Sequence, residues 1–194
     1  MANIAIICGY GLVGNKYRTY EEMLGLDEYY DTIAYILKNS KISKIVFTGG
    51  KTNLLFPEIS EAKSAMTYYK LVSKNYTINI LRHTLIPEER STTSHGNIYH
   101  SIIKLVKQNY FNKNDDTLHI FCDEPRWFKM QVICWFYLRS NGINYKINPC
   151  NRIDTTKKST WYFQLILGIP KMLLEREFWT KYNRLKVLIN GLQP

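Results

Sequence analysis

Short apolar runs alternate with amphipathic segments along most of the chain. Residues 4–8 form a continuous apolar run that ends at Gly9, a pattern typical of a strand buried on both faces. Comparable runs occupy residues 44–48, 77–81, 118–122 and 143–147. We therefore predict five β-strands at these positions.

The segments between these runs have helical periodicity. The first opens with Ser60 in an N-cap position, a second begins near Thr93 or Ser94, and a third covers about residues 126–138. Their apolar stripes contain Ala62, Ala65, Met66 and Tyr69, then Ile98, Ile102, Leu105 and Val106, then Trp127, Met130, Cys134 and Tyr137. Strands that alternate with helices predict a three-layer, Rossmann-like α/β fold with a doubly wound, mostly parallel five-stranded sheet.

The alternation ends after residue 147, and a C-terminal helical extension follows. Residues 148–160 are polar and basic, which predicts a loop, and two helical segments follow at about 161–174 and 175–190. The second segment has one apolar stripe, made of Phe178, Tyr182, Leu185 and Leu188 or Ile189. We predict an α/β domain over residues 1–148, and a basic loop and helices over 149–194 that pack on this domain or extend it.

The positive charge of the chain is concentrated in its last third. The chain has 194 residues, a formal net charge of +10 and 45% hydrophobic residues, which suits one domain with a sizeable core and excludes an intrinsically disordered protein. Residues 1–125 contain 14 Lys and Arg against 13 Asp and Glu, whereas residues 126–194 contain 12 against 3. Such an excess favours an anionic partner, such as nucleic acid or a membrane surface.

The cysteines match neither a disulfide framework nor a metal site. Cys8, Cys122, Cys134 and Cys150 are widely separated, without a C-x-x-C pair or a histidine at metal-ligand spacing, which predicts buried, reduced thiols. The chain opens with a predicted strand instead of a signal segment, and its apolar runs are shorter than the roughly 20 residues of a membrane helix. We therefore expect a cytoplasmic protein without a transmembrane segment.

The glycines after the first strand match a dinucleotide-binding fingerprint in part. Gly9, Gly11 and Gly14 have the G-x-G-x-x-G spacing, in which glycines let the backbone approach a pyrophosphate. The fingerprint also needs an apolar helix at once and a carboxylate about 20 residues further on. Residues 15–20 are polar instead, and the second strand ends at Thr48-Gly49-Gly50. A dinucleotide-dependent enzyme is accordingly a lesser alternative, and the sequence identifies no cofactor.

Polar residues and glycines follow the predicted strands, and a doubly wound sheet places such positions along one edge. Glycines, hydroxyls and helix N-termini suit an anionic group such as phosphate, and cations would neutralise its charge. Some of these residues can instead have purely structural roles, since Ser60 and Ser94 also suit helix caps and the glycines suit turns. The predicted ligand-binding residues are Gly9, Gly11, Gly49, Gly50, Ser60, Glu61, Glu88, Ser91, Ser94, Asn97, Asp123, Arg126 and Lys129.

Three spaced motifs in this set resemble those of a known family. Thr48-Gly49-Gly50, Ser60-Glu61-Ala62 and Glu88-x-x-Ser91-x-x-Ser94-x-x-Asn97 are similar to the S-G-G, S-E-A-x-x-M and E-x-x-S-x-x-T-x-E-N motifs of the YdcF/SanA/ElyC family. The resemblance covers about residues 3–148, and Met66 stands one residue later than the methionine of the family. It implies a Rossmann-like α/β domain and a link to the integrity of the bacterial cell envelope.

The chain departs from the family pattern after the fourth predicted strand. The family has T-S-x-x-H-x-x-R-A there, whereas this chain has Arg126 in place of the histidine and Lys129 in place of the arginine. Gly96 also replaces a glutamate, and no arginine stands near Tyr29 and Tyr30. Arginine stays protonated near neutral pH, so it cannot replace a histidine in proton transfer. The pattern favours holding an anion over acid–base catalysis, and it leaves open whether the protein is an enzyme.

Two function classes follow from these patterns. We expect first a site for an anionic, phosphorylated or nucleotide-like small molecule at the C-terminal edge of the sheet. The alternative is nucleic-acid or anionic-membrane binding through the basic C-terminal third, with residues 161–190 as the segment for membrane contact. Among the histidines, His95 is the best placed for chemistry, and its alternative is a water-exposed position in the first turn of a helix.

Overall fold

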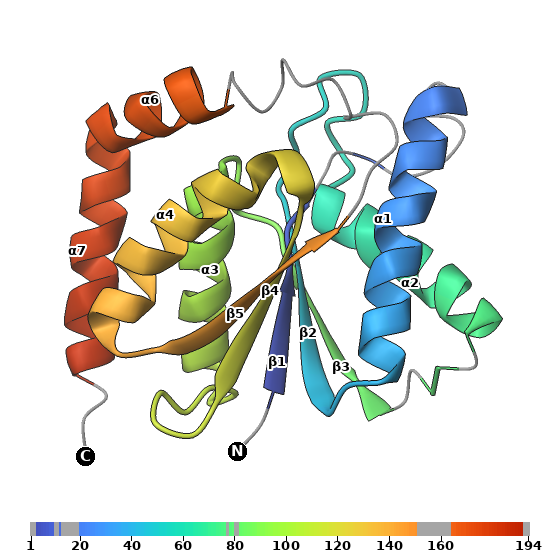
Figure 1. The fold of residues 1–194 in the computed structure, drawn as a ribbon, viewed down its shortest axis with the longest axis horizontal. Coiled ribbons are helices and arrows are strands. Elements are labelled where there is room, and N and C mark those ends of the chain that lie inside the picture. Colours follow the sequence, from blue (N-terminus) through green and yellow to red (C-terminus); the bar gives the residue numbers. More distant parts are fainter. Residues whose placement is uncertain are drawn as a thin grey trace.

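A parallel five-stranded sheet crosses the centre of the molecule in the order β3-β2-β1-β4-β5 (Figure 1). This computed structural model describes residues 3–9, 12, 20–76, 78–79, 82–150 and 164–191. The strands are β1 (Asn3–Ile7), β2 (Ile42–Thr48), β3 (Thr84–Glu88), β4 (Thr117–Asp123) and β5 (Asn144–Cys150). The predicted doubly wound α/β fold is confirmed, and every pair of neighbouring strands is parallel.

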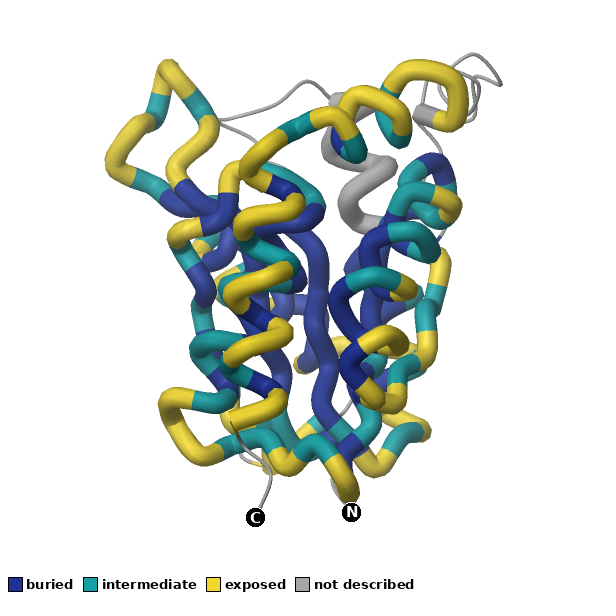
Figure 2. Tube along the Cα trace, turned by 90° about the vertical axis from the view of Figure 1, so that its left-hand side faces the viewer, coloured by how far each residue is buried: buried dark blue, intermediate teal, exposed yellow. Residues whose placement is uncertain are grey.

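Helices cover both faces of this sheet (Figures 1 and 2). One face carries α1 and α2, and the other carries α3, α4 and α7, with η6 and α6 joining the layer at its upper end. The helices are α1 (Tyr20–Lys38), α2 (Glu61–Asn75), α3 (Ser94–Lys107), α4 (Trp127–Tyr137), α6 (Ile169–Leu174) and α7 (Arg176–Asn190). Shorter turns are the 3₁₀ helices η3 (Glu124–Arg126) and η4 (Arg139–Asn141) and the π-helical η6 (Gln164–Gly168).

The central strand β1 shows why the strands of this sheet have continuous apolar sequences. Ile4 and Ile6 pack into the core beneath α3, α4 and α7, whereas Ala5 and Ile7 pack beneath α1 and α2. All four side chains are fully buried. A strand that has helices on both faces has no side for polar residues, so the alternation typical of a half-exposed strand is absent. Figure 2 shows these buried strands between helices whose outer sides are exposed.

The third strand differs from the prediction for residues 77–81, which is wrong. β3 lies at 84–88, and Ile78 and Asn79 belong to no strand, while residues 77, 80 and 81 lie outside the described part. The Ile78 N–H donates to the Ser73 carbonyl (3.1 Å), so the apolar run begins by closing the end of α2. Pro87 makes β3 look unlike a strand, but β3 is at the edge of the sheet, where a missing N–H is tolerated.

The C-terminal helices belong to the same core as the sheet. Phe178, Leu185 and Ile189 are buried against α3 and α4, which confirms the predicted stripe of the last helix. The Tyr137 hydroxyl donates to the Phe178 carbonyl (2.8 Å) and fixes α7 to α4. The predicted helix over 161–174 is instead η6 followed by α6, and residues 151–163, with most of the predicted basic loop, lie outside the described part.

All four cysteines are buried free thiols, as their spacing predicts. Burial raises the pKa of Cys8 and of Cys150 to about 12, so both thiols are protonated near neutral pH. Within the described ranges, no helix is both long and apolar enough to cross a membrane. The same ranges contain no group of three His, Cys, Asp or Glu side chains that could hold a metal ion.

Candidate ligand-binding pocket

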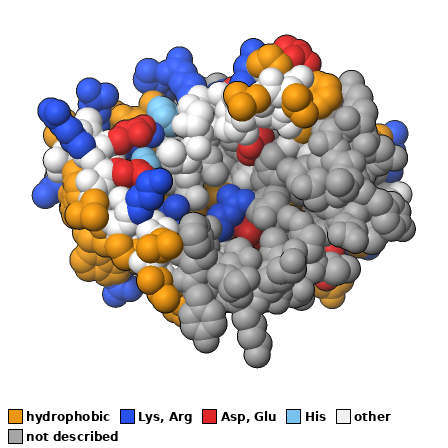
Figure 3. Space-filling view, turned by 90° about the horizontal axis from the view of Figure 1, so that it is seen from above, with side chains coloured by type: hydrophobic (Ala, Val, Ile, Leu, Met, Phe, Trp, Pro, Cys, Tyr) orange, Lys and Arg blue, Asp and Glu red, His pale blue; other side chains and the backbone are white. Residues whose placement is uncertain are grey.

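A cavity of about 510 Å³ lies at the C-terminal ends of the strands, where the strand order reverses between β1 and β4. This is the place where doubly wound folds bind ligands, and the volume falls in the usual range of roughly 300–1,000 Å³ for small molecules. Seen from above, cationic and acidic side chains lie together in a central hollow (Figure 3). The lining residues are Gly9, Gly49, Thr52, Glu61, Ser91, Thr92, Thr93, Ser94, His95, Asn97, Arg126, Lys129, Met172 and Glu175.

Backbone hydrogen bonds join the segments that the sequence motifs pick out. The Gly49 N–H donates to the Glu88 carbonyl (3.0 Å), and the Gly50 N–H donates to the Ser91 carbonyl (2.6 Å). The Glu61 N–H, at the start of α2, donates to the Gly50 carbonyl (3.0 Å). These donors are therefore used within the protein. The expectation that the two glycines and the start of α2 offer N–H groups to an anion is wrong.

Gly9 and Gly49, the two glycines that line the cavity, allow a side chain to approach the backbone closely. Gly49 has a φ of +130°, and a Cβ there would lie 2.7 Å from the Cβ of Glu61. A Cβ on Gly9 would lie 2.1 Å from the Thr48 carbonyl oxygen. Since neither glycine has a side chain, Glu61 packs over both, and its carboxylate accepts a hydrogen bond from the Thr52 hydroxyl at the edge of the cavity.

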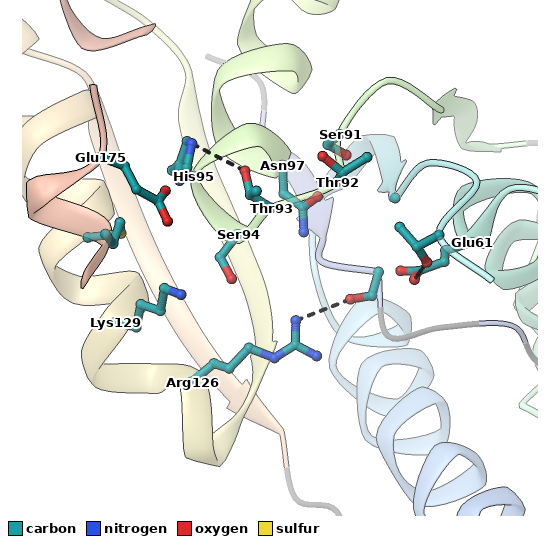
Figure 4. Close-up of a pocket in the computed structure, with 14 residues that line it drawn as sticks. Glu61, Ser91, Thr92, Thr93, Ser94, His95, Asn97, Arg126, Lys129 and Glu175 are labelled. Carbon is teal, nitrogen blue, oxygen red and sulfur yellow. Dashed lines mark hydrogen bonds between the residues drawn. The ribbon is translucent and has the colours of Figure 1, made fainter. Parts of the chain in front are cut away.

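The start of α3 forms a second wall. The Glu88 carboxylate accepts hydrogen bonds from the Arg90 N–H (2.7 Å) and the Ser91 hydroxyl (2.5 Å), which shapes the loop after β3. Thr93 is the N-cap, and its hydroxyl oxygen accepts the Gly96 N–H (3.1 Å). Ser94 is therefore the first residue of the helix and not its cap. Its hydroxyl points into the cavity (Figure 4). The first N–H groups of a helix have no carbonyl partner within the helix, and Thr93 satisfies that of Gly96.

Two cations enter the cavity from the segment after β4. The Arg126 Nε lies 2.7 Å from the Asp123 Oδ1, and the Arg126 Nη1 donates to the Gly9 carbonyl (3.3 Å), so the guanidinium spans the ends of β4 and β1. The Asp123 side chain is 3% exposed and the Arg126 side chain 21%. Lys129 lies one turn further along and also points into the cavity (Figure 4). Burial and the positive charge of Arg126 lower the pKa of Lys129.

His95 lies at the far side of the cavity and is buried, so the water-exposed alternative for it is wrong. Burial and the nearby Lys181 lower its pKa from the usual 6.5 to about 4, so the imidazole is neutral near neutral pH. Its Nε2 lies 3.2 Å from the Thr93 hydroxyl oxygen, and its ring packs edge-on against Phe178 at 5.7 Å between centroids. The histidine is thus fixed between the α3 cap and α7.

Most of the predicted binding residues come together here. Eight of them line the cavity, and four stand behind its walls, while Gly11 lies outside the described residues. The four behind the walls are Gly50, Ser60, Glu88 and Asp123. Ser60 acts as the N-cap of α2, with its hydroxyl accepting the Lys63 N–H (3.2 Å).

Met172 and Glu175 also line the cavity, and the sequence patterns do not predict them. Met172 lies in α6 and Glu175 directly follows it, at the upper end of the helix layer that contains α4 and α7 (Figure 1). They follow no strand and belong to no motif, so no sequence signal marks them. Thr52, Thr92 and Thr93 stand beside motif residues and could have been found from that position.

The cavity as a whole has two chemical ends. Arg126 and Lys129 lie on one side of the cavity, Glu61 and Asn97 lie on the side away from Lys129, and Glu175 faces the cavity near both His95 and Lys129 (Figure 4). Such a site can hold an anionic group beside the cations and accept hydrogen bonds elsewhere. Comparisons of the chain with models of known protein families, with curated proteins and with solved structures found no match.

Proposed function

We propose that the cavity binds a small molecule with an anionic group, of the phosphorylated or nucleotide-like class. The observation that carries the proposal is the pair of cations, Arg126 and Lys129, beside the start of α3 (Figure 4). The Ser94 hydroxyl and the positive end of the helix dipole lie at the same place. An anion there would meet two positive charges and several hydrogen-bond donors.

The guanidinium is fixed in place before any ligand arrives. Asp123 and the Gly9 carbonyl hold Arg126 from two sides, so binding need not order a long, flexible side chain. Lys129 also has a reason to favour an anion. Burial and Arg126 destabilise its positive charge more than Glu175 stabilises it, so the pKa of Lys129 is lowered, and a bound phosphate would oppose that shift. The site therefore gains more from a negative ligand than an exposed lysine pair would.

The opposite end of the cavity restricts the ligand further. Glu61 is an acceptor and carries negative charge, and Asn97 adds an amide. A compound that is anionic throughout would be repelled by Glu61. A compound with a phosphate at one end and hydroxyl or amino donors at the other satisfies both ends. This supports a sugar phosphate or nucleotide over inorganic phosphate.

The motifs also support our proposal that the chain is a variant member of the YdcF/SanA/ElyC family. Thr48-Gly49-Gly50, Ser60-Glu61-Ala62 and the Glu88–Asn97 segment lie around one cavity and are joined by backbone hydrogen bonds. Arg126 and Lys129 both face that cavity, in the positions where the family has histidine and arginine. Arginine in the place of the histidine keeps its proton near neutral pH, which favours holding a ligand over moving protons.

Thermal unfolding with related compounds, with and without a phosphate, tests the binding proposal. We expect adenosine monophosphate, at about 100 times its Kd, to raise the Tm of the protein by about 5–10 °C. Adenosine, which has no phosphate, should have little effect. Lys129→Gln should lose most of the shift, whereas Lys70→Gln, an exposed lysine on the opposite layer of helices, should keep it.

Two outcomes would contradict the proposal. One is that none of adenosine monophosphate, ribose 5-phosphate and inorganic phosphate raises the Tm. The other is an equal shift in the wild type and in Lys129→Gln, because the phosphate would then lie away from the two cations.

A further inference from the structure

The segment from η6 through α6 presents aliphatic side chains to solvent. Ile166 is 65% exposed, Leu167 54% and Leu174 86%. The opposite side of α6 is buried, since Met172 is in the core and lines the cavity with Glu175. The segment therefore has apolar side chains on both sides, one set in the core and the other in contact with solvent.

The exposed apolar side chains continue onto the neighbouring helices. η6 packs against α4, and α6 packs against α7. On α4, Phe128 and Trp135 are exposed one above the other, two turns apart on the outer side. From above, hydrophobic side chains gather along this flank of the molecule (Figure 3). We call this set the apolar rim, and it consists of Phe128, Trp135, Leu165, Ile166, Leu167, Leu174 and Trp179.

Cationic side chains predominate beside the apolar rim, where the exposed carboxylate of Glu177 is paired with Lys181 at 2.6 Å. Lys171 on α6 and Arg176 at the start of α7 are exposed, and the acidic residue between them, Glu175, lines the cavity. Residues 126–194 together have a net charge of +9. A second copy of the chain would place the same cations against one another, so self-association through this surface is disfavoured. Nucleic acid would match the charge but not the aliphatic side chains.

We propose that the apolar rim docks the protein on a bilayer surface that contains anionic lipids. Aliphatic and aromatic side chains can enter the boundary between headgroups and acyl chains, while lysine and arginine contact the headgroups. The helical segment is too short to span the bilayer, so it lies in the plane of the interface. The inference does not depend on the ligand of the cavity, although docking through α6 brings the cavity close to the lipid surface.

Co-sedimentation of the full chain with vesicles tests this inference. We expect the wild type to sediment with vesicles of phosphatidylcholine and phosphatidylglycerol, and much less with phosphatidylcholine alone. Leu167→Asp should lower the vesicle partition coefficient about tenfold, because it removes one aliphatic side chain from the interface and adds a charge that the headgroups repel. Leu174→Asp should act similarly.

Leu71→Asp is the matched control. Leu71 lies on α2, on the other layer of helices, and is 57% exposed against 54% for Leu167. The two variants change the same residue type and the same net charge, so only the position differs. Leu71→Asp should bind vesicles as the wild type does. Circular dichroism should show both variants folded, since both positions are exposed.

Three results would overturn the inference. The wild type could remain in the supernatant with anionic vesicles, or Leu167→Asp and Leu71→Asp could bind equally well. The third is a wild-type dimer on size-exclusion chromatography that Leu167→Asp converts to a monomer without any vesicle binding. The apolar rim would then be an interface between two copies of the chain.

Discussion

Arg126 illustrates how one side chain can organise a site. A buried charge needs a partner, and Asp123 supplies it at 2.7 Å, while the Gly9 carbonyl holds the other side of the guanidinium. Burial raises the pKa of Asp123, and the positive charge of Arg126 opposes that shift. The position of Arg126 after the fourth strand could be predicted from the sequence. Its contact with Gly9, 117 residues earlier, depends on which strands become neighbours.

Gly49→Ala should destabilise the protein by about 1–3 kcal/mol, because alanine at a φ of +130° is strained and its Cβ would meet Glu61. Chemical denaturation measures the change. Gly191→Ala is the control. Gly191 has a φ of −74°, and a Cβ there would lie at least 3.4 Å from the nearest atoms, which is an ordinary van der Waals contact. It should change the free energy of unfolding by less than about 0.5 kcal/mol. Equal effects of the two substitutions would refute the strain at Gly49.

His95 should make the protein less stable as the pH falls from about 6.5 to about 4. In this window the unfolded chain binds a proton at His95 while the folded chain does not, so stability is lost with acidification. His95→Gln keeps a hydrogen-bonding group near Thr93 but cannot titrate. We expect its unfolding free energy to fall less across this window, by on the order of 1–2 kcal/mol after solvent screening. Parallel pH curves for the two proteins would argue against a buried, neutral His95.

Helices with local signals could be predicted closely from the sequence. α2 and α3 begin where a serine and a threonine suit the N-cap, and the predicted stripes are buried except for Met66 and Val106, which are half-buried. β3 could not be placed, because Pro87 is acceptable only in an edge strand and the order of the strands is not a local property. The break between η6 and α6 was missed for a similar reason, since packing on α4 shapes that segment.

The cap of α2 provides a test of these local signals. Ser60→Ala should lower the free energy of unfolding by about 1 kcal/mol, because the Lys63 N–H loses its acceptor in a buried place. Thr67→Ala, at an exposed position inside the same helix, should be neutral or slightly stabilising. Urea denaturation compares the two. A Ser60→Ala variant as stable as the wild type would show that the cap contributes little.

In the folded molecule the basic residues lie in two different places. Arg126 and Lys129 face the cavity, whereas cations such as Lys171 and Arg176 lie on the outside beside the apolar rim. The cavity edge could be predicted from the rule that parallel strands end together. The part of the cavity wall that Met172 and Glu175 form could not be predicted. Their position depends on how the C-terminal helices pack on the rest of the molecule.

The most direct test is a crystal structure of the protein with adenosine monophosphate. We expect electron density for the phosphate between Lys129, Arg126 and the Ser94 hydroxyl, with the ribose toward Glu61. Density for the nucleotide at another surface, or an empty cavity in crystals of a protein that binds the nucleotide in solution, would contradict it.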